Sequence, residues 1–148
     1  MKNKIFKTDD SYIGFILRTA LAIVVFPHGA QKLFGWFGGY GFLGTMEFFT
    51  ETVGLPWIIG FLVIILESIG AIVLLAGFAT RIVAFSYILL ALGITFTSHF
   101  ENGFFMNWFG NQAGEGYEYF ILWIGIAIAL TIIGSGKYSF DRNMRVNS

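Results

Sequence analysis

The chain has 148 residues, of which 56% are hydrophobic and only 12% charged, with a formal net charge of zero and no cysteine. A soluble domain carries about 25% charged residues, so this chain cannot cover a water-exposed surface with polar groups. The lack of cysteine excludes disulfides, thiolate nucleophiles and Cys-ligated zinc or clusters, and no basic stretch suggests nucleic-acid binding. Any redox chemistry must therefore use a bound cofactor, a substrate or a partner chain.

The chain opens on a lysine-containing segment that resembles the positive region of a secretory signal. Two features argue against cleavage: Asp9 and Asp10 follow the lysines, and no A-x-A site closes the apolar run. We therefore expect a cytoplasmic tail followed by a retained helix.

Four apolar stretches follow, each close to the roughly 20 residues that a helix needs to cross a hydrocarbon core. Pro56 suits the first position of the second stretch, because that position needs no backbone donor. The sequence therefore predicts an all-α membrane protein, with residues 1–148 forming one domain built as a four-transmembrane-helix bundle. The predicted spans are residues 12–34, 56–78, 82–99 and 117–133, and the predicted outer loops are residues 35–55 and 100–116.

Both outer loops are rich in glycine and aromatic residues. Within the first loop, Thr45–Thr52 is predicted to form a short interfacial helix. Its apolar side chains Met46, Phe48 and Phe49 are expected to dip into the headgroup region.

The two loops also suggest an internal repeat. His28 and His99 each end an odd-numbered span, and each is followed by a Trp-Phe-Gly sequence. Such a repeat would make the bundle two parallel hairpins related by an axis along the membrane normal.

Lysine and arginine residues outside the spans set the expected orientation, because they are retained on the cytoplasmic side. They are numerous on the side that holds both ends of the chain, whereas Lys32 is the only one on the opposite side. Both termini are therefore predicted to be cytoplasmic, with Arg81 as an anchor in the turn between the second and third spans. The basic residues are Lys2, Lys4, Lys7, Arg81, Lys137, Arg142 and Arg145; glutamates 47, 51, 101 and 115 lie opposite; and Trp36, Trp57 and Trp108 mark the outer interface.

Ionisable side chains inside the predicted spans are the main functional signal. Each costs about 2.5–3.5 kcal/mol on insertion scales, so each needs a reason. Glu67 lies near the middle of the second span, and Arg18 lies in the cytoplasmic half of the first. His28, Gln31 and Lys32 lie in the outer half of the first span, where their spacing places them on one helix face.

In the predicted topology these groups gather in the outer half of the membrane, with Glu67 one or two turns deeper. They would form a polar pocket, walled by aromatic rings and open to the outer face, that suits a flat, partly apolar molecule such as a quinone. Histidine and carboxylate groups there can relay protons. The expected roles are catalytic for His28, Glu67, His99 and Glu118; ligand-binding for Gln31, Lys32, Arg18 and Trp36; and structural for Arg81 and for Pro27, which should kink the first helix.

Other interpretations of the same residues stay open. Lys32 can extend to the lipid headgroups, and Arg18 can pair with a lipid phosphate or a carbonyl. His99 and Glu118 can be interface residues that never meet. Glu67 can form an ion pair with Arg18 or Lys32 that only holds the bundle together.

No metal or haem is expected. His28, His99, Glu67 and Glu118 offer two imidazoles and two carboxylates, and two histidines could also ligate haem. However, neither H-x-x-E nor E-x-x-H spacing occurs, and either site would use both histidines of the chain.

Several motifs resemble those of one family. Arg18 to Gly39 reads RTALAIVVFPHGAQKLFGWFGG, the second span carries E-x-x-G, and the turn after it carries G-x-x-T-R. The third span ends in H-x-x-N-G-F-F, the fourth opens on GYEY, and GSGKYSFDR closes the pattern. This combination, spread over nearly the whole chain, resembles the DoxX family of bacterial membrane proteins.

The resemblance implies a multi-pass location in the bacterial inner (plasma) membrane and a quinone-linked redox role. The family is related to the small subunit of thiosulfate:quinone oxidoreductase, and other members are linked to oxidative and quinone stress. The family's polar positions are matched here by His28, Lys32, Glu67, Arg81, His99 and Glu118.

Three functional hypotheses follow. The first is a quinone-linked oxidoreductase subunit or redox-stress protein, whose electrons come from a redox partner subunit or a reducing substrate. The second is a non-enzymatic membrane scaffold or assembly subunit, and the third is a proton or small-solute pathway. The Gly-rich helix faces also permit a homo-oligomer within the lipid bilayer.

Overall fold

The computed structural model describes residues 6–146, and every regular element in that range is a helix. Lys2 and Lys4, which contribute to the predicted charge asymmetry, and the side chain of Arg145 lie outside the described part. In chain order the main elements are α2 (Tyr12–Phe34), α3 (Gly41–Glu47), η2 (Phe48–Thr52), α4 (Trp57–Ile65), η3 (Leu66–Gly70), α5 (Ala71–Ala76), α6 (Thr80–Ile94), η4 (Thr95–His99), α7 (Glu118–Ile133) and α8 (Phe140–Val146). Short 3₁₀ turns, η1 (Trp36–Gly38) and η5 (Phe100–Asn102), end the first and third long helices, and η2, η3 and η4 are π-helical turns.

Three helices in the described range are long and apolar enough to cross a membrane: Tyr12–Phe34, Trp57–Ala76 and Thr80–Asn102. They correspond to the first three predicted spans, and α2 runs without interruption through Pro27. The fourth predicted span corresponds to α7, which has 16 residues. At 1.5 Å per residue α7 is about 24 Å long, less than the roughly 30 Å of a hydrocarbon core.

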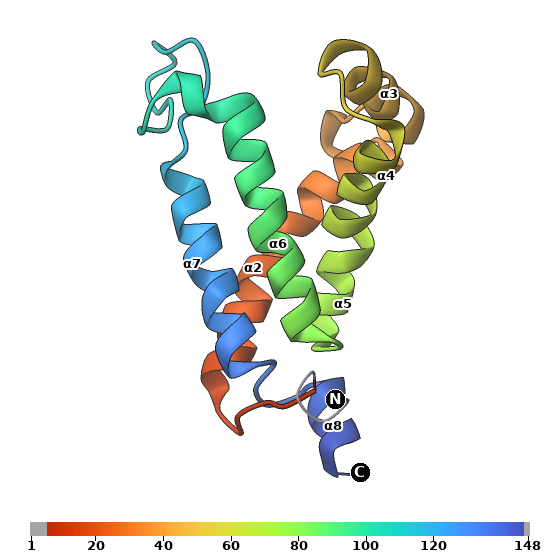
Figure 1. The fold of residues 1–148 in the computed structure, drawn as a ribbon, viewed down its shortest axis with the longest axis vertical. Coiled ribbons are helices and arrows are strands. Elements are labelled where there is room, and N and C mark those ends of the chain that lie inside the picture. Colours follow the sequence, from red (N-terminus) through yellow and green to blue (C-terminus); the bar gives the residue numbers. More distant parts are fainter. Residues whose placement is uncertain (1–5, 147–148) are drawn as a thin grey trace.

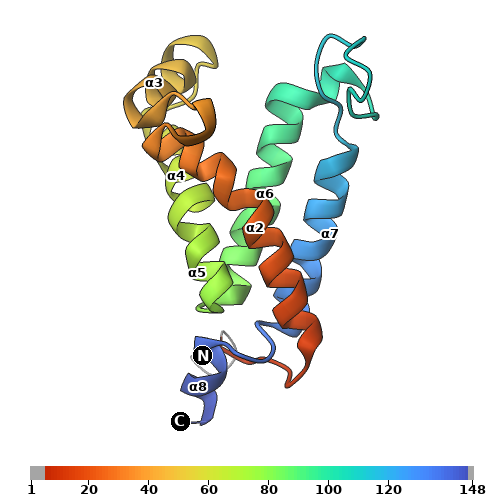
Figure 2. The same cartoon turned by 180° about the vertical axis from the view of Figure 1, so that it is seen from behind.

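The helices are closely tied at one end of the molecule and diverge at the other (Figures 1 and 2). Helices α6 and α7 lie side by side, and α2 crosses them diagonally, starting beside the end of α7 and finishing beside α3 and α4. The described segment before α2 and helix α8 both lie at the tied end, which we call the base. The α3–α4 segments and the α6–α7 hairpin form two separate arms at the opposite end.

The core fills the space where α2, α5, α6 and α7 meet. Val25, Leu74, Ala84 and Leu130 are fully buried there. The outward faces carry large apolar side chains instead, for example Leu122 at 69% exposure. Such a surface would be unfavourable in water but suits contact with lipid chains.

Arg18 ties the base together. Its side chain is 1% exposed, and its guanidinium donates only to backbone carbonyls: to Leu74 and Leu75 at the end of α5, and to the segment after α7. The acceptors in that segment are Ser135 at 3.0 Å, Lys137 at 3.1 Å and Tyr138 at 2.6 Å. One buried cation therefore bridges the ends of two hairpins, and the carbonyl-pairing interpretation of Arg18 is the one that the geometry matches.

Two further charged residues complete this arrangement at the base. Arg81 donates to the carbonyls of Thr131 at 3.0 Å and Ile132 at 2.8 Å, so it caps the last turn of α7. The Asp141 carboxylate accepts from the backbone N–H groups of Ala79 at 2.7 Å and Thr80 at 3.0 Å, where α6 begins. We refer to Arg18, Arg81 and Asp141 with these partners as the basal network.

The first loop contains the predicted short helix, with a longer range than expected. Helical structure runs from Gly41 through Thr52, as α3 followed by η2. Phe48 is 47% exposed, in agreement with an outward-facing position. Met46, however, is only 5% exposed, so its expected place among the headgroups is wrong; its sulfur packs toward Gly60 of α4 instead.

Arg18→Ala should strongly destabilise the protein, because it leaves buried carbonyls of both hairpins without their donor. Hydrogen bonds to charged groups contribute about 1.5–3 kcal/mol each, so we expect a loss of at least about 3 kcal/mol in the free energy of unfolding. Thermal or denaturant unfolding in detergent micelles measures it. Arg142→Ala is the control: its ion pair with Asp10 is exposed on both sides, and its loss should change stability by no more than about 0.5 kcal/mol.

Candidate functional site

A buried ion pair between the first and second long helices is the centre of the candidate site. Lys32 Nζ lies 2.5 Å from Oε2 of Glu67; the glutamate side chain is 2% exposed and the lysine side chain 24%. Of the two partners considered for Glu67, Arg18 and Lys32, the structure therefore selects Lys32. Lys32 reaches inward to this carboxylate rather than outward to the lipid headgroups.

Two local features bring α2 and the Glu67 segment together. Gly29 packs directly on the backbone of Glu67 and Ser68, where a Cβ atom would collide with the chain. Glu67 itself lies in the π-helical turn η3, and such turns often occur where a helix presents a functional side chain. A glycine on one helix and a widened turn on the other thus allow the carboxylate to reach Lys32, one turn beyond Gly29.

His28 and Gln31 flank this ion pair on α2. The side chain of His28 is exposed, its carbonyl accepts a long 3.5 Å bond from Lys32 Nζ, and its ring is close enough to Lys32 and Glu67 to interact with their charges. Gln31 Nε2 donates to the carbonyl of Phe37 at 3.3 Å, which directs it toward the first loop. Trp36 is 53% exposed in that loop.

The opposite wall of the site comes from α6 and α7 and was not predicted from the sequence. Tyr87 is fully buried and donates to the carbonyl of Leu66, beside Glu67, at 3.0 Å. The rings of Tyr87 and Tyr119 lie 5.6 Å and 6.0 Å from that of Trp123. Tyr87 therefore connects these rings to the helix segment that carries Glu67.

His99 and Glu118 belong to a separate set of contacts on the α6–α7 arm. His99 Nδ1 lies 2.8 Å from the carbonyl of Glu115, and the Glu118 carboxylate accepts from the backbone of Met106 at 2.9 Å and from Trp108 Nε1 at 3.3 Å. These contacts hold the second outer loop. Within residues 6–146, no hydrogen bond or ion pair joins His99 or Glu118 to the Lys32–Glu67 pair.

The two arginines assigned to the site or its support lie at the base, in the network described above. Arg18 is fully engaged by carbonyls there, so we leave it out of the candidate ligand site. Arg81 donates to the carbonyls of Lys7, Thr131 and Ile132. Among the described residues, no three His, Asp or Glu side chains lie close enough together to hold a metal ion.

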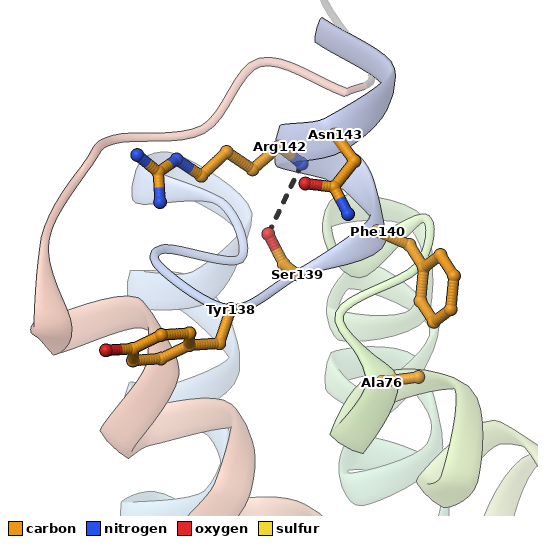
Figure 3. A pocket seen from close by; sticks show the side chains of 6 residues that line it. All are labelled: Ala76, Tyr138, Ser139, Phe140, Arg142 and Asn143. Atoms are coloured by element: carbon orange, nitrogen blue, oxygen red, sulfur yellow. Dashed lines mark hydrogen bonds between the residues drawn. The ribbon is translucent and has the colours of Figure 1, made fainter. Parts of the chain in front are cut away.

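Two cavities of about 270 Å³ lie elsewhere on the molecule. One is at the base between the end of α5 and α8, and Figure 3 shows the Arg142 guanidinium extending away from Ser139 and Phe140 there. The other is an apolar groove between α2 and α5 that faces the surrounding medium. Its lining residues are Ala22, Ile23, Phe26, Ala71, Ile72 and Leu75. Neither contains the Lys32–Glu67 pair.

The residues around Glu67 can bind a polar group within an apolar surrounding. Lys32 offers a cationic donor, His28 a titratable imidazole, and Glu67 a carboxylate that has only one of its two oxygens engaged by described residues. The aromatic rings supply flat apolar surface beside them. Such a combination suits a planar molecule with polar oxygens at its edge.

Comparison with known proteins identifies the family of the chain. The DoxX family model matches residues 13–100, a range that includes the whole ion pair and its supporting glycine. The chain is also 31% identical over 116 residues to the Bacillus subtilis (strain 168) protein named "Putative oxidoreductase CatD", a match that covers 78% of this chain and 76% of that protein. No solved structure matches the chain significantly.

Lys32→Met should destabilise the protein more than the double variant Lys32→Met/Glu67→Gln. The single change leaves a 2%-exposed carboxylate without its counter-charge, and removing one partner of a buried pair costs about 3–5 kcal/mol. Neutralising both partners removes that penalty, so most of the loss should be recovered. Unfolding in micelles measures the wild type, Lys32→Met, Glu67→Gln and the double variant. Lys137→Met, at the base of the bundle, is the control. Equal losses for the single and double variants would contradict a buried pair.

Proposed function

The chain belongs to the DoxX family, and from this premise we propose that it is a bacterial inner-membrane protein of quinone-linked oxidoreduction that binds its quinone beside Lys32 and Glu67. The observation that supports this most directly is the buried Lys32–Glu67 pair, with the aromatic rings of α6 and α7 on its far side. The oxidoreductase name carried by the Bacillus subtilis relative agrees with a redox role.

The residues present fit a quinone. A quinone head is planar and apolar on its faces, with carbonyl oxygens at its edge, and its reduction takes up protons together with electrons. Lys32 is placed to donate a hydrogen bond to such an oxygen. His28, four residues before Lys32 on α2, is the group that we propose to carry protons to and from the bound quinone.

The electrons have to come from outside this chain. It contains no cysteine, and its described residues form no metal-binding cluster. We therefore propose a redox partner subunit or a reducing substrate as the donor. The exposed aromatic residues of the second outer loop, Phe105 at 66%, Trp108 at 79% and Phe109 at 90%, are candidates for contact with such a partner. The same exposure favours the scaffold hypothesis as the second candidate function.

We further propose that α7 is a fourth span and that both termini are cytoplasmic. Helix α7 packs along α6 over its length, and its outward face is as apolar as that of α6. The described segment before α2 and helix α8 lie at the same end of the bundle, next to Arg81, Lys137 and Arg142 (Figure 1). An even number of spans would place both ends of the chain on the same side of the membrane. The proposal also includes the two-hairpin pseudo-repeat.

Quinone binding tests the site. The purified protein in micelles or nanodiscs should bind a short-tail benzoquinone or naphthoquinone, and His28→Ala and Glu67→Gln should each weaken binding by about tenfold, the effect of losing about 1.4 kcal/mol. Quinone-difference spectra or titration calorimetry measure this, and Arg142→Ala at the base is the control.

Unchanged quinone affinity in both His28→Ala and Glu67→Gln would refute the site assignment. Loss of partner co-purification in Trp108→Ala, with no quinone binding by the wild type, would favour the scaffold instead.

The topology is testable because the chain has no cysteine of its own. Single substitutions Asn111→Cys in the second outer loop and Asn143→Cys in α8 introduce one thiol each, both at exposed positions. In intact cells a membrane-impermeant maleimide should label the first and not the second. Labelling of both positions, or of Asn143→Cys alone, would contradict the proposed orientation.

A further inference from the structure

Helix α7 carries two buried polar groups that the proposed function leaves unused. The Tyr119 hydroxyl oxygen and Trp123 Nε1 are both inaccessible, and neither has a hydrogen-bond partner among the described residues. The whole Trp123 side chain is 4% exposed. Leaving a buried donor unsatisfied costs about 1–3 kcal/mol, so two such donors close together require an explanation.

The two donors are neighbours on one helix face. Tyr119 and Trp123 are four residues apart in α7, and their rings meet edge to face with centroids 6.0 Å apart. The buried ring of Tyr87 packs against Trp123 from α6. Tyr87 differs in one respect: its own hydroxyl is satisfied by the Leu66 carbonyl.

Tyr87 connects this pair of donors to the candidate site. The Tyr87 ring lies 5.6 Å from that of Trp123, and the Tyr87 hydroxyl donates to the carbonyl of Leu66, next to Glu67. Tyr87 therefore lies between the Trp123 ring and the helix segment that carries Glu67.

We propose that Tyr119 and Trp123 form a second binding subsite, which donates hydrogen bonds to a carbonyl oxygen of the ligand held beside Lys32 and Glu67. The inference rests on the proposed quinone site and names the residues that bind the second oxygen of the quinone. A para-quinone has oxygens at opposite edges of its ring, so one can face Lys32 while the other accepts from α7. The aromatic donors thereby become specificity residues for a ligand with two acceptor groups.

Tyr119→Phe is the sharpest test, because it deletes one hydroxyl and keeps the ring. It should weaken binding of the benzoquinone probe by about 2- to 10-fold, the range expected for one neutral hydrogen bond. Trp123→Phe should act in the same direction. Tyr117→Phe is the matched control, since its ring stacks on Phe100 near the start of the same helix, away from Glu67.

Infrared difference spectra of the bound quinone give a readout that a purely structural role would not move. Loss of a donor should raise the stretching frequency of one quinone carbonyl in Tyr119→Phe and leave it unchanged in Tyr117→Phe. Wild-type binding that is weakened by Glu67→Gln but unaffected, in affinity and carbonyl frequency, by both α7 variants would overturn this inference and leave the proposed function intact. Absence of quinone binding by the wild type would overturn both.

Discussion

The structure depends on one guanidinium buried where two hairpins end. Arg18 bonds carbonyls at the end of α5 and carbonyls after α7, segments that are more than fifty residues apart from it and from each other in sequence. Carbonyls at helix ends have no partner within their own helix, and lipid cannot supply one. A single planar cation with several donors satisfies them together and fixes how the hairpins meet. Because Arg81 and Asp141 cap α7 and α6 in the same region, the base has little freedom to open.

A rigid base and divergent arms determine where polar chemistry can lie. At the base the buried charges of Arg18 and Asp141 are paired with backbone groups of the described residues. Further along, α2 leaves α7 and packs on the Glu67 segment, and the close contact at Gly29 fixes the register that brings Lys32 to its partner. The ion pair thus lies where the arms begin to separate. The close contact of Gly29 with the Glu67 segment is on one side of it, and the aromatic rings of α6 and α7 are on the other. The charges of the basal network and those of the proposed site therefore lie at different levels along the bundle.

The sequence was sufficient for the elements and insufficient for their contacts. Apolar runs and Pro56 predicted the long helices within a few residues, because hydropathy is a local property. The choice between Arg18 and Lys32 as partner of Glu67 could not be made, since it depends on the register set by Gly29 and a π-helical turn. Tyr119 and Trp123 read as ordinary aromatic residues of an apolar helix, and their unsatisfied donors become visible only once the neighbours are placed. Asp141, beyond the last apolar run, gave no sign that it caps a helix some sixty residues earlier.

The length of α7 has a consequence for the lipid as well as for the protein. A helix of about 24 Å cannot match a hydrocarbon layer of roughly 30 Å, and its partner α6, continued by η4 and η5, is considerably longer. Such hydrophobic mismatch is relieved by thinning the membrane locally or by drawing headgroups inward. With α7 as the fourth span that we propose, the bilayer beside it should be compressed, with water and polar headgroups nearer to the first turns of the helix, where Glu118 and Tyr119 lie. The thickness of the surrounding membrane should therefore affect how deeply the first turns of α7 are buried in lipid.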